Sequence, residues 1–277
     1  MTNTIINGEP ASVLASNDRA IQYGDGLFET LAVRNGKIEY WSQHMARLRR
    51  GCLQLQLPII DESIWLDDIK QLNTGVNSVI KLVQTRGAGG RGYAFQDDIK
   101  PTRMVVVSEW PTYPLHWTEQ GVGVRRCATP ITMNTALAGV KHLNRLDNVL
   151  ARHEWQDKNI AEGLMCDASD NVIEGTMSNV FAIKDNLLYT PALHRAGVRG
   201  VMREQIMFMA AQLNFSVQER DISIKELFTM DEIFLSNSLI GIWPVIAIDE
   251  TNYTVGKITK ILQQHLKQDV SRHDSTL

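Results

Sequence analysis

Residues 136–152 read ALAGVKHLNRLDNVLAR and place Lys141 among apolar residues, just ahead of a stretch with helical spacing. A second segment, residues 171–181 with the sequence NVIEGTMSNVF, places Glu174 in a strand-like run. Lysine and glutamate are usually solvated surface residues. Because apolar or small residues flank both of them here, we expect both side chains to face the interior of the protein.

These two residue types together suggest a carbonyl cofactor. A lysine amine can form an imine with an aldehyde, and an acidic residue can keep the ring nitrogen of pyridoxal phosphate protonated, so that the ring withdraws electrons. Lys141 and Glu174 therefore predict a cofactor held as an imine. The rest of the chain must then supply a site for its phosphate.

Length and composition restrict the class of protein. With 277 residues and 44% hydrophobic content, the chain can form one large or two medium domains. It has no apolar run of the roughly 18 to 20 residues that a membrane span needs, and its first residues do not resemble a signal peptide, so we expect a cytoplasmic protein. A net charge of −3 favours neither nucleic acid nor an anionic membrane as a partner.

The cysteines are three in number, widely spaced, and lack the spacing patterns of a metal site. We expect Cys52, Cys127 and Cys166 to be core thiols, neither metal ligands nor disulfide partners. The sequence therefore predicts no metal site.

Strands and helices are mixed along the chain. Residues 27–41 predict two strands joined by a tight turn at Asn35 and Gly36, which tolerate the positive φ angles of such a turn. The stretch 111–121, with two prolines, is the best candidate for a linker. We therefore predict an α/β (α+β) chain with two domains, residues 1–114 and 115–277, of which the second binds the cofactor.

Two details of the second domain can also be predicted. Apolar residues recur at helical spacing after Lys141 and predict a helix from about residue 145, with Asn144 as its N-cap. The last residues, SRHDSTL, have the composition of a disordered end.

A phosphate site can be sought where a helix begins. The segment AGVRGVMRE, residues 196–204, places Gly197 and Gly200 at an expected helix start, where unpaired backbone N–H groups and the helix dipole attract anions. Arg47, on a predicted amphipathic helix, could add a fixed positive charge. The ordinary alternatives stay open, because a glycine at a helix start is more often only a turn and such an arginine more often faces solvent.

Residues 86–93, RGAGGRGY, place two arginines and a tyrosine among glycines. An RNA-binding element of this type needs repeated copies in a basic context, and here a single copy stands in a slightly acidic chain. We interpret the segment as a loop that directs Arg91 at a substrate carboxylate.

Seven segments, in chain order, resemble the class IV aminotransferase family, the fold type IV enzymes that bind pyridoxal phosphate: YGDGLFET, HMARL, RGAGGRGY, GVKHLNRLDNVLAR, EGTMSNVF, AGVRGVMRE and FLSNSLIGIWPV. The resemblance spans nearly the whole chain. It implies a two-domain enzyme with an N-terminal α/β sandwich and a C-terminal β-barrel-like domain with helices. It also implies a homodimer that acts on a small-molecule substrate with pyridoxal 5'-phosphate as its cofactor.

The resemblance assigns a role to each matching position. Lys141 forms the imine and then acts as a base, and Glu174 meets the ring nitrogen. The residues that hold the cofactor's phosphate are Arg47, Val201, Met202 and Ser238. Arg91 and Tyr93 contact the substrate, and Thr30 donates a proton. Val201 and Met202 act through their backbone N–H groups, and Lys141 is an alternative proton donor to Thr30.

Two positions depart from the transaminases of the family. Leu146 stands where branched-chain aminotransferases have a tyrosine for the cofactor hydroxyl, and Tyr93 stands where D-amino-acid aminotransferases have a histidine. Both departures argue against a transaminase. The segments GGRGY, KHLNRLDNVLAR and NSLIGIWPV resemble the lyases of the family, which release pyruvate and an aromatic amine. Two alternatives stay open: an aminotransferase of D- or branched-chain amino acids, and a non-catalytic binding protein in which Lys141 is structural.

Overall fold

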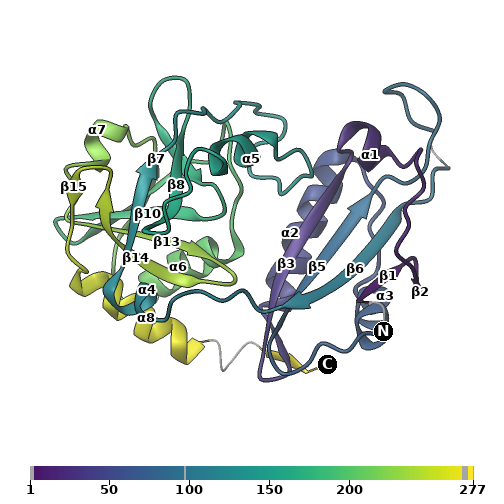
Figure 1. Cartoon of the computed structure of the whole chain (residues 1–277), viewed down its shortest axis with the longest axis horizontal. Coiled ribbons are helices and arrows are strands. Elements are labelled where there is room, and N and C mark those ends of the chain that lie inside the picture. The colour runs from purple at the N-terminus through teal and green to yellow at the C-terminus, as the bar shows by residue number, and fades with distance from the viewer. Residues whose placement is uncertain (1–2, 97, 270–273, 277) are drawn as a thin grey trace. The chain divides into compact units, whose positions relative to one another are not determined.

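A computed structural model describes residues 3–96, 98–269 and 274–276 of the chain. The chain divides into two compact units (Figure 1). Unit 1 contains the described residues up to Pro111, the segment Val140–Asn144 and the strand Asp274–Thr276. Unit 2 contains Thr112–Gly139 and the described residues from Arg145 to the end of the last helix. No helix among the described residues is long and apolar enough to span a membrane.

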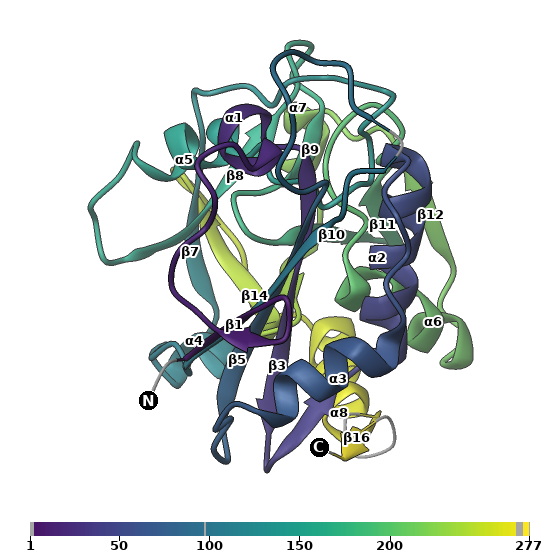
Figure 2. The same ribbon diagram turned by 90° about the vertical axis from the view of Figure 1, so that its right-hand side faces the viewer.

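Unit 1 is an antiparallel sheet of seven strands in the order β16-β4-β3-β5-β6-β1-β2. Its strands are β1 (Thr4–Ile6), β2 (Glu9–Pro10), β3 (Gly26–Arg34), β4 (Lys37–Glu39), β5 (Ser78–Thr85), β6 (Thr102–Glu109) and β16 (Asp274–Thr276). Its helices are α1 (Arg19–Tyr23), α2 (Trp41–Leu55) and α3 (Glu62–Lys70). The longer two cover one face of the sheet (Figure 2) and bury an apolar core that includes Leu31, Ile80 and Trp65.

The turn predicted between the first two long strands is confirmed. Asn35 and Gly36 have φ angles of 52° and 74° and join β3 to β4. Because side chains alternate between the two faces of a strand, β3 directs Leu27, Glu29 and Leu31 to the helix-covered face. Phe28 and Thr30 therefore lie on the opposite face.

Unit 2 is a nine-stranded sheet with the order β12-β11-β10-β13-β14-β7-β8-β9, and β15 pairs with β14. Its strands are β7 (Val122–Arg126), β8 (Ile160–Cys166), β9 (Val172–Gly175), β10 (Asn179–Lys184), β11 (Leu187–Pro191), β12 (Val217–Arg220), β13 (Glu232–Asn237), β14 (Gly241–Ile248) and β15 (Thr251–Asn252). The sheet is mixed, because three of its pairings are parallel: β11 with β12, β14 with β7, and β7 with β8. It curls around an apolar core (Figure 1), and the predicted mixed α/β fold class is confirmed.

Among its described residues, unit 2 has five helices: α4 (His116–Gln120), α5 (Leu146–Arg152), α6 (Val201–Gln212), α7 (Ile224–Leu227) and α8 (Lys257–Asp269). The stretch 111–121, predicted as a linker, contains α4. This short helix packs Trp117 edge-on against Trp243 of β14, with 5.0 Å between ring centroids.

The segment with Lys141 packs in unit 1, although we expected every residue after 115 to belong to the second domain. Phe28 donates its N–H to the carbonyl of Lys141 (3.1 Å), and Leu143 donates to that of Gly26 (3.0 Å). Val140–Asn144 therefore pairs alongside the start of β3 in unit 1. Sequence patterns did not reveal this, because such pairing depends on backbone hydrogen bonds between residues more than 100 positions apart.

Two further predictions were wrong. Asn144 is not the N-cap of α5: the helix begins after Arg145 without a side-chain cap, and Asn144 Nδ2 donates to the carbonyl of Gly24 (3.2 Å). In the C-terminal stretch predicted to be disordered, Asp274–Thr276 forms β16 and pairs with β4, a backbone interaction that composition does not encode. The other residues of that stretch lie outside the described ones.

Candidate active site

A buried carboxylate in unit 1 holds two side chains of α2. Glu29 of β3 is 1% exposed and binds Arg47 through two hydrogen bonds, from Nε to Oε1 (2.8 Å) and from Nη2 to Oε2. His44 Nδ1 lies 2.6 Å from Glu29 Oε2. His44 and Arg47 share one face of α2 because they are three residues apart. The candidate phosphate arginine therefore has its guanidinium fixed by an ion pair.

The protonation states of these groups follow from their surroundings. Burial by itself raises the pKa of Glu29, but the charge and hydrogen bonds of Arg47, with the hydrogen bond from His44, lower it to about 2. Burial lowers the pKa of His44, and the charges of Arg47 and Lys141 lower it further against the opposing effect of Glu29. At neutral pH the cluster thus holds an ionised carboxylate, a guanidinium and a neutral imidazole.

Lys141 and Thr30 lie on the other face of β3. The Lys141 Nζ is 4.2 Å from the centroid of the Phe28 ring, and the side chain is half-buried. Thr30 is two residues along the strand and shares the face of Phe28. Unit 1 thus places the predicted base and the predicted proton donor on the same face of β3.

Arg91 and Tyr93 lie on the connection between β5 and β6. Both are exposed, and Tyr93 has 85% of its surface accessible. The first arginine of the same segment, Arg86, is buried instead and binds Asp25 through Nε (2.7 Å) and Nη2 (3.1 Å). The two arginines of RGAGGRGY therefore have different environments, and only Arg91 is accessible to a ligand.

Glu174 lies in unit 2, on β9, and is 4% exposed, as expected. Its Oε2 accepts a hydrogen bond from the backbone N–H of Val198 (2.8 Å). Arg145, which the sequence did not single out, is a charged neighbour: burial lowers its pKa, and the carboxylates of Glu174 and Asp147 oppose that change. A carboxylate is a hydrogen-bond acceptor suited to an N–H donor.

The start of α6 has an open backbone. Gly200 is its N-cap, no side chain caps it, and Val201 and Met202 are 1% and 2% exposed. A Cβ at position 200 would lie 2.0 Å from Oδ1 of Asn179, so only glycine fits there. The first N–H groups of a helix have no acceptor within the helix, and the helix dipole adds positive potential there.

Ser238 lies in the turn between β13 and β14. Asn237 shapes this turn, because its Oδ1 accepts from the N–H groups of Leu239 (2.8 Å) and Ile240 (3.0 Å). The strand pairing of Asn179 with Ser236 puts the turn at the same end of the sheet as the start of β10. Asn179 also binds the carbonyl of Val198 just before α6 (2.9 Å). Unit 2 thus gathers Glu174, the start of α6 and Ser238 at one end of its sheet.

Glu162 is a buried residue that sequence reasoning missed. It is 1% exposed and accepts hydrogen bonds from the backbone N–H groups of Gly163, Thr176 and Met177 and from the hydroxyls of Thr176 and Ser178. Burial raises the pKa of its carboxyl, and these hydrogen bonds oppose the rise. Glu162 therefore fixes the turn that follows Glu174. A lone glutamate in the apolar strand IAEGLMC was the available signal.

The candidate residues thus fall into two sets. Unit 1 carries Lys141, Thr30, Arg47, Arg91 and Tyr93. Unit 2 carries Glu174, Val201, Met202 and Ser238. Among the described residues, no group of three or more histidine, cysteine, aspartate or glutamate side chains is placed to hold a metal ion. The three cysteines are buried and free, as expected of core thiols.

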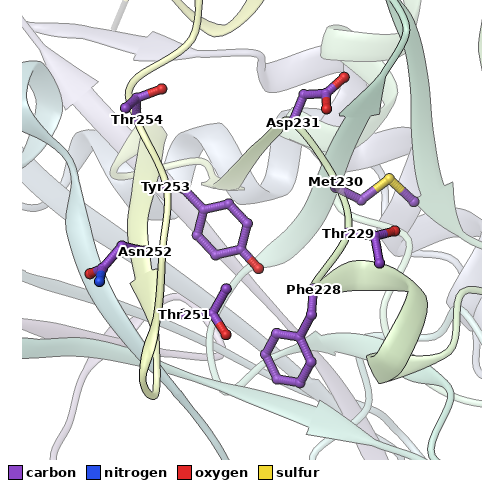
Figure 3. Close-up of a pocket in the computed structure, with 8 residues that line it drawn as sticks. All are labelled: Phe228, Thr229, Met230, Asp231, Thr251, Asn252, Tyr253 and Thr254. Carbon is purple, nitrogen blue, oxygen red and sulfur yellow. The ribbon is translucent and has the colours of Figure 1, made fainter.

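A cavity of about 330 Å³ lies elsewhere in unit 2, beside β15 (Figure 3). Tyr253 points into the group of residues that line it, and Asp231, at its edge, is already bound to Lys184 (2.8 Å) and to the N–H of Asp185 (3.0 Å). None of the candidate site residues lines this cavity. We therefore do not assign the candidate chemistry to it.

Comparison with known proteins identifies the family. The family profile described as "Amino-transferase class IV" matches residues 26–248. The chain is 34% identical over 270 residues to an aminodeoxychorismate lyase of Vibrio harveyi, covering 94% of this chain and 98% of that protein. It is 30% identical to a D-alanine aminotransferase of Staphylococcus epidermidis, covering 99% of each.

One solved structure is also similar over nearly its whole length. The crystal structure of 4-amino-4-deoxychorismate lyase from Pseudomonas aeruginosa superposes with a TM-score of 0.93 at 43% identity, covering 96% of this chain and 98% of that one. The resemblance inferred from the sequence motifs is therefore confirmed.

The ion pair of Glu29 should make stability depend on acid pH. Its folded pKa of about 2 lies below the ordinary 4.5, so its stabilisation is fully present above about pH 4.5 and is lost as pH falls towards 2. By linkage the loss is roughly 3 kcal/mol at most. We expect Glu29→Gln to be less stable than wild type at pH 7, with a difference that shrinks towards pH 2, as measured by urea unfolding across this range.

The control is Glu9→Gln, which removes an exposed carboxylate of the same unit. It should follow the wild-type pH dependence. Parallel curves for wild type and Glu29→Gln would contradict the assignment of an ionised, arginine-bound Glu29.

Proposed function

Because the chain belongs to the class IV aminotransferase family, we propose that it is a pyridoxal-phosphate-dependent lyase that converts 4-amino-4-deoxychorismate to 4-aminobenzoate and pyruvate, a step of folate synthesis. One observation carries this proposal: the similarity to two proteins named as this lyase extends over almost the entire chain, in sequence and in structure. The departures at Leu146 and Tyr93 from the transaminase pattern support it.

The residues present fit the proposed cofactor. In unit 1, Glu29 fixes the guanidinium of Arg47, which is a donor of the kind that binds a phosphate. In unit 2, the uncapped start of α6 and the Ser238 hydroxyl are donors of the same kind. Glu174 is a buried carboxylate that can hold a proton at the pyridine nitrogen. The amine of Lys141 is half-buried against Phe28 and can hold the cofactor covalently through Nζ.

The chemistry then divides between the cofactor and the chain. Pyridoxal phosphate, when bound, supplies an electron-withdrawing ring that stabilises negative charge at the carbon bearing the substrate amine. Lys141 Nζ, in its neutral form, removes the proton from that carbon. The bond from the neighbouring carbon to the enolpyruvyl oxygen breaks, the substrate ring becomes aromatic, and the departing fragment takes up a proton to give pyruvate. Lys141 Nζ or Thr30 Oγ1 donates this proton.

Arg91 and Tyr93 are proposed to bind a substrate carboxylate. Arginine suits this role because its planar guanidinium binds a carboxylate through two hydrogen bonds. Arg91 and Tyr93 are both exposed on the same connection.

An aminotransferase acting on D-amino acids is the second candidate, because the chain is also similar to a D-alanine aminotransferase along its full length. The two functions differ in their need for an amino acceptor. An aminotransferase requires a keto acid, whereas the lyase requires none.

The purified protein should release 4-aminobenzoate and pyruvate from 4-amino-4-deoxychorismate without any added keto acid, as followed by fluorescence of the aromatic product. Lys141→Met should lower the rate by about 10²–10⁴-fold or more, because it removes the proposed base. Lys81→Met is the matched control, since Lys81 Nζ also lies over the Phe28 ring, at 5.2 Å. Exchange of amino groups between amino and keto acids with no aromatic product would instead establish the aminotransferase.

Lys141 should be the site of covalent cofactor attachment. Borohydride reduction of the protein as isolated, followed by peptide mapping, should place a pyridoxyl group on Lys141 and leave Lys81 unmodified. A modified lysine at another position would refute the assignment. The absence of any modified lysine would also refute it and would favour a non-catalytic protein with a structural Lys141.

We also propose a homodimer in the cytoplasm. Three large apolar side chains of α5 are exposed in the single chain: Leu146 (75%), Val149 (61%) and Leu150 (59%). Adjoining apolar side chains on a surface are typical of a protein contact, and a second copy of the same chain is the commonest partner. Three buried, unpaired thiols suit a reducing compartment.

Leu150→Asp should shift the protein from dimer towards monomer in sedimentation velocity at micromolar concentration, because a carboxylate would have to be desolvated at the interface. Leu53→Asp, at an equally exposed leucine of α2 (64%), is the control and should leave the dimer intact. A wild-type monomer, or a Leu150→Asp dimer of unchanged affinity, would contradict the proposed interface.

A further inference from the structure

We propose that Arg19 is a positioning residue that holds the Arg91 and Tyr93 loop in the conformation that receives the substrate carboxylate. This inference rests on the proposed function, because it takes Arg91 as a substrate-binding residue. Arg19 belongs to α1, on a different part of the chain from the loop, and no role was assigned to it from the sequence.

The Arg19 guanidinium binds three successive backbone carbonyls of the loop. Nη1 donates to the carbonyls of Gly92 (3.0 Å) and Ala94 (3.4 Å), and Nη2 donates to that of Tyr93 (2.9 Å). Three consecutive carbonyls therefore point at one cation. This arrangement fixes the backbone on the C-terminal side of Arg91 while leaving the Arg91 side chain exposed.

The same guanidinium is anchored on its other side. Arg19 Nε donates to Asp25 Oδ2 (2.8 Å), and Asp25 also accepts two hydrogen bonds from Arg86. Burial raises the pKa of Asp25, but the hydrogen bonds and charges of Arg86 and Arg19 lower it below its ordinary value, so the anchor is ionised. Arg19 itself is only 3% exposed. It is therefore a built-in structural cation and not a group that waits for a ligand.

Aromatic residues also contact the loop and its flanking residues. The Tyr23 hydroxyl accepts from the N–H of Gly92 (3.1 Å), and the Tyr23 ring lies 5.4 Å from that of Tyr93. The guanidinium carbon of Arg19 is 4.9 Å from the Tyr23 ring. At the other end, the guanidinium carbon of Arg86 lies 3.8 Å from the ring of Phe95. The loop is thus held by α1 and its flanking residues, although its own side chains are largely exposed.

An arginine is required for this geometry. Its guanidinium has five N–H donors in a planar fork, so it can bind Asp25 and three carbonyls at once, whereas lysine has one ammonium at a single point. Without the fork the loop would regain backbone freedom, and that entropy would have to be lost again on substrate binding. The expected consequence is weaker substrate binding with little change in the chemical step.

The test compares Arg19→Met and Arg19→Lys with a matched control in the holoenzyme. The control is Arg103→Met, which removes another arginine of unit 1; its Nε binds a buried aspartate of α3, Asp68 (2.6 Å). Limited trypsin digestion with peptide mapping reports cleavage after Arg91, and steady-state kinetics with 4-amino-4-deoxychorismate reports KM and kcat separately.

Arg19→Met should accelerate cleavage after Arg91 and raise KM about tenfold or more, with kcat within about threefold of wild type, because binding is lost before the chemical step. Arg19→Lys should resemble Arg19→Met, since lysine restores the charge but not the fork. Arg103→Met should change neither cleavage after Arg91 nor KM.

Unchanged protection of the loop in Arg19→Met would overturn the proposal, and so would faster cleavage with an unchanged KM. Wild-type protection in Arg19→Lys would overturn the requirement for the fork. The digestion readout does not depend on catalysis, so a wild-type protein without lyase activity would refute the proposed function while digestion still decides whether Arg19 holds the loop.

Discussion

Burying the carboxylate of Glu29 beneath α2 would cost several kcal/mol if no cation met it, and Arg47 meets it with two hydrogen bonds. This ion pair fixes the position of α2 on the sheet and orients the guanidinium proposed to hold a phosphate. Burial lowers the pKa of His44 at the same carboxylate, and the charges of Arg47 and Lys141 lower it further. Since β3 carries Glu29 on one face and Phe28 on the other, one strand sets the surroundings of both Arg47 and Lys141.

In unit 2, buried carboxylates are stabilised mainly by backbone N–H donors. Glu162 accepts from three N–H groups and two hydroxyls, and Glu174 accepts from the N–H of Val198. Each buried carboxylate therefore fixes a stretch of irregular chain, one after β9 and the other before α6. The helix start at Gly200 has no side-chain cap, and only glycine fits there because any Cβ would collide with Asn179. The proposed cofactor residues are accordingly held by hydrogen bonds within the unit.

Three arginines at the proposed substrate loop have different roles. Arg86 and Arg19 are buried and share Asp25, whereas Arg91 is exposed. A buried arginine satisfies its donors with carbonyls and a carboxylate, and an exposed one keeps its donors for a ligand. The division follows from burial, which the segment RGAGGRGY by itself does not reveal.

The sequence by itself determined the family, the mixed α/β class, the hairpin at Asn35 and Gly36 and the helix beginning after Gly200, because each depends on local patterns or on short motifs. It could also single out Lys141 and Glu174, since a charged residue among apolar neighbours is visible in one dimension. Only the tertiary structure decided that Val140–Asn144 pairs alongside the start of β3 and that Asn144 binds Gly24 instead of capping α5. It alone revealed Glu29, Glu162 and Arg19 as the groups that hold the candidate residues, because they bind partners that lie up to 75 positions away along the chain. Hydrogen bonds between such distant groups are fixed by packing and strand register, which a linear pattern of residue types does not specify.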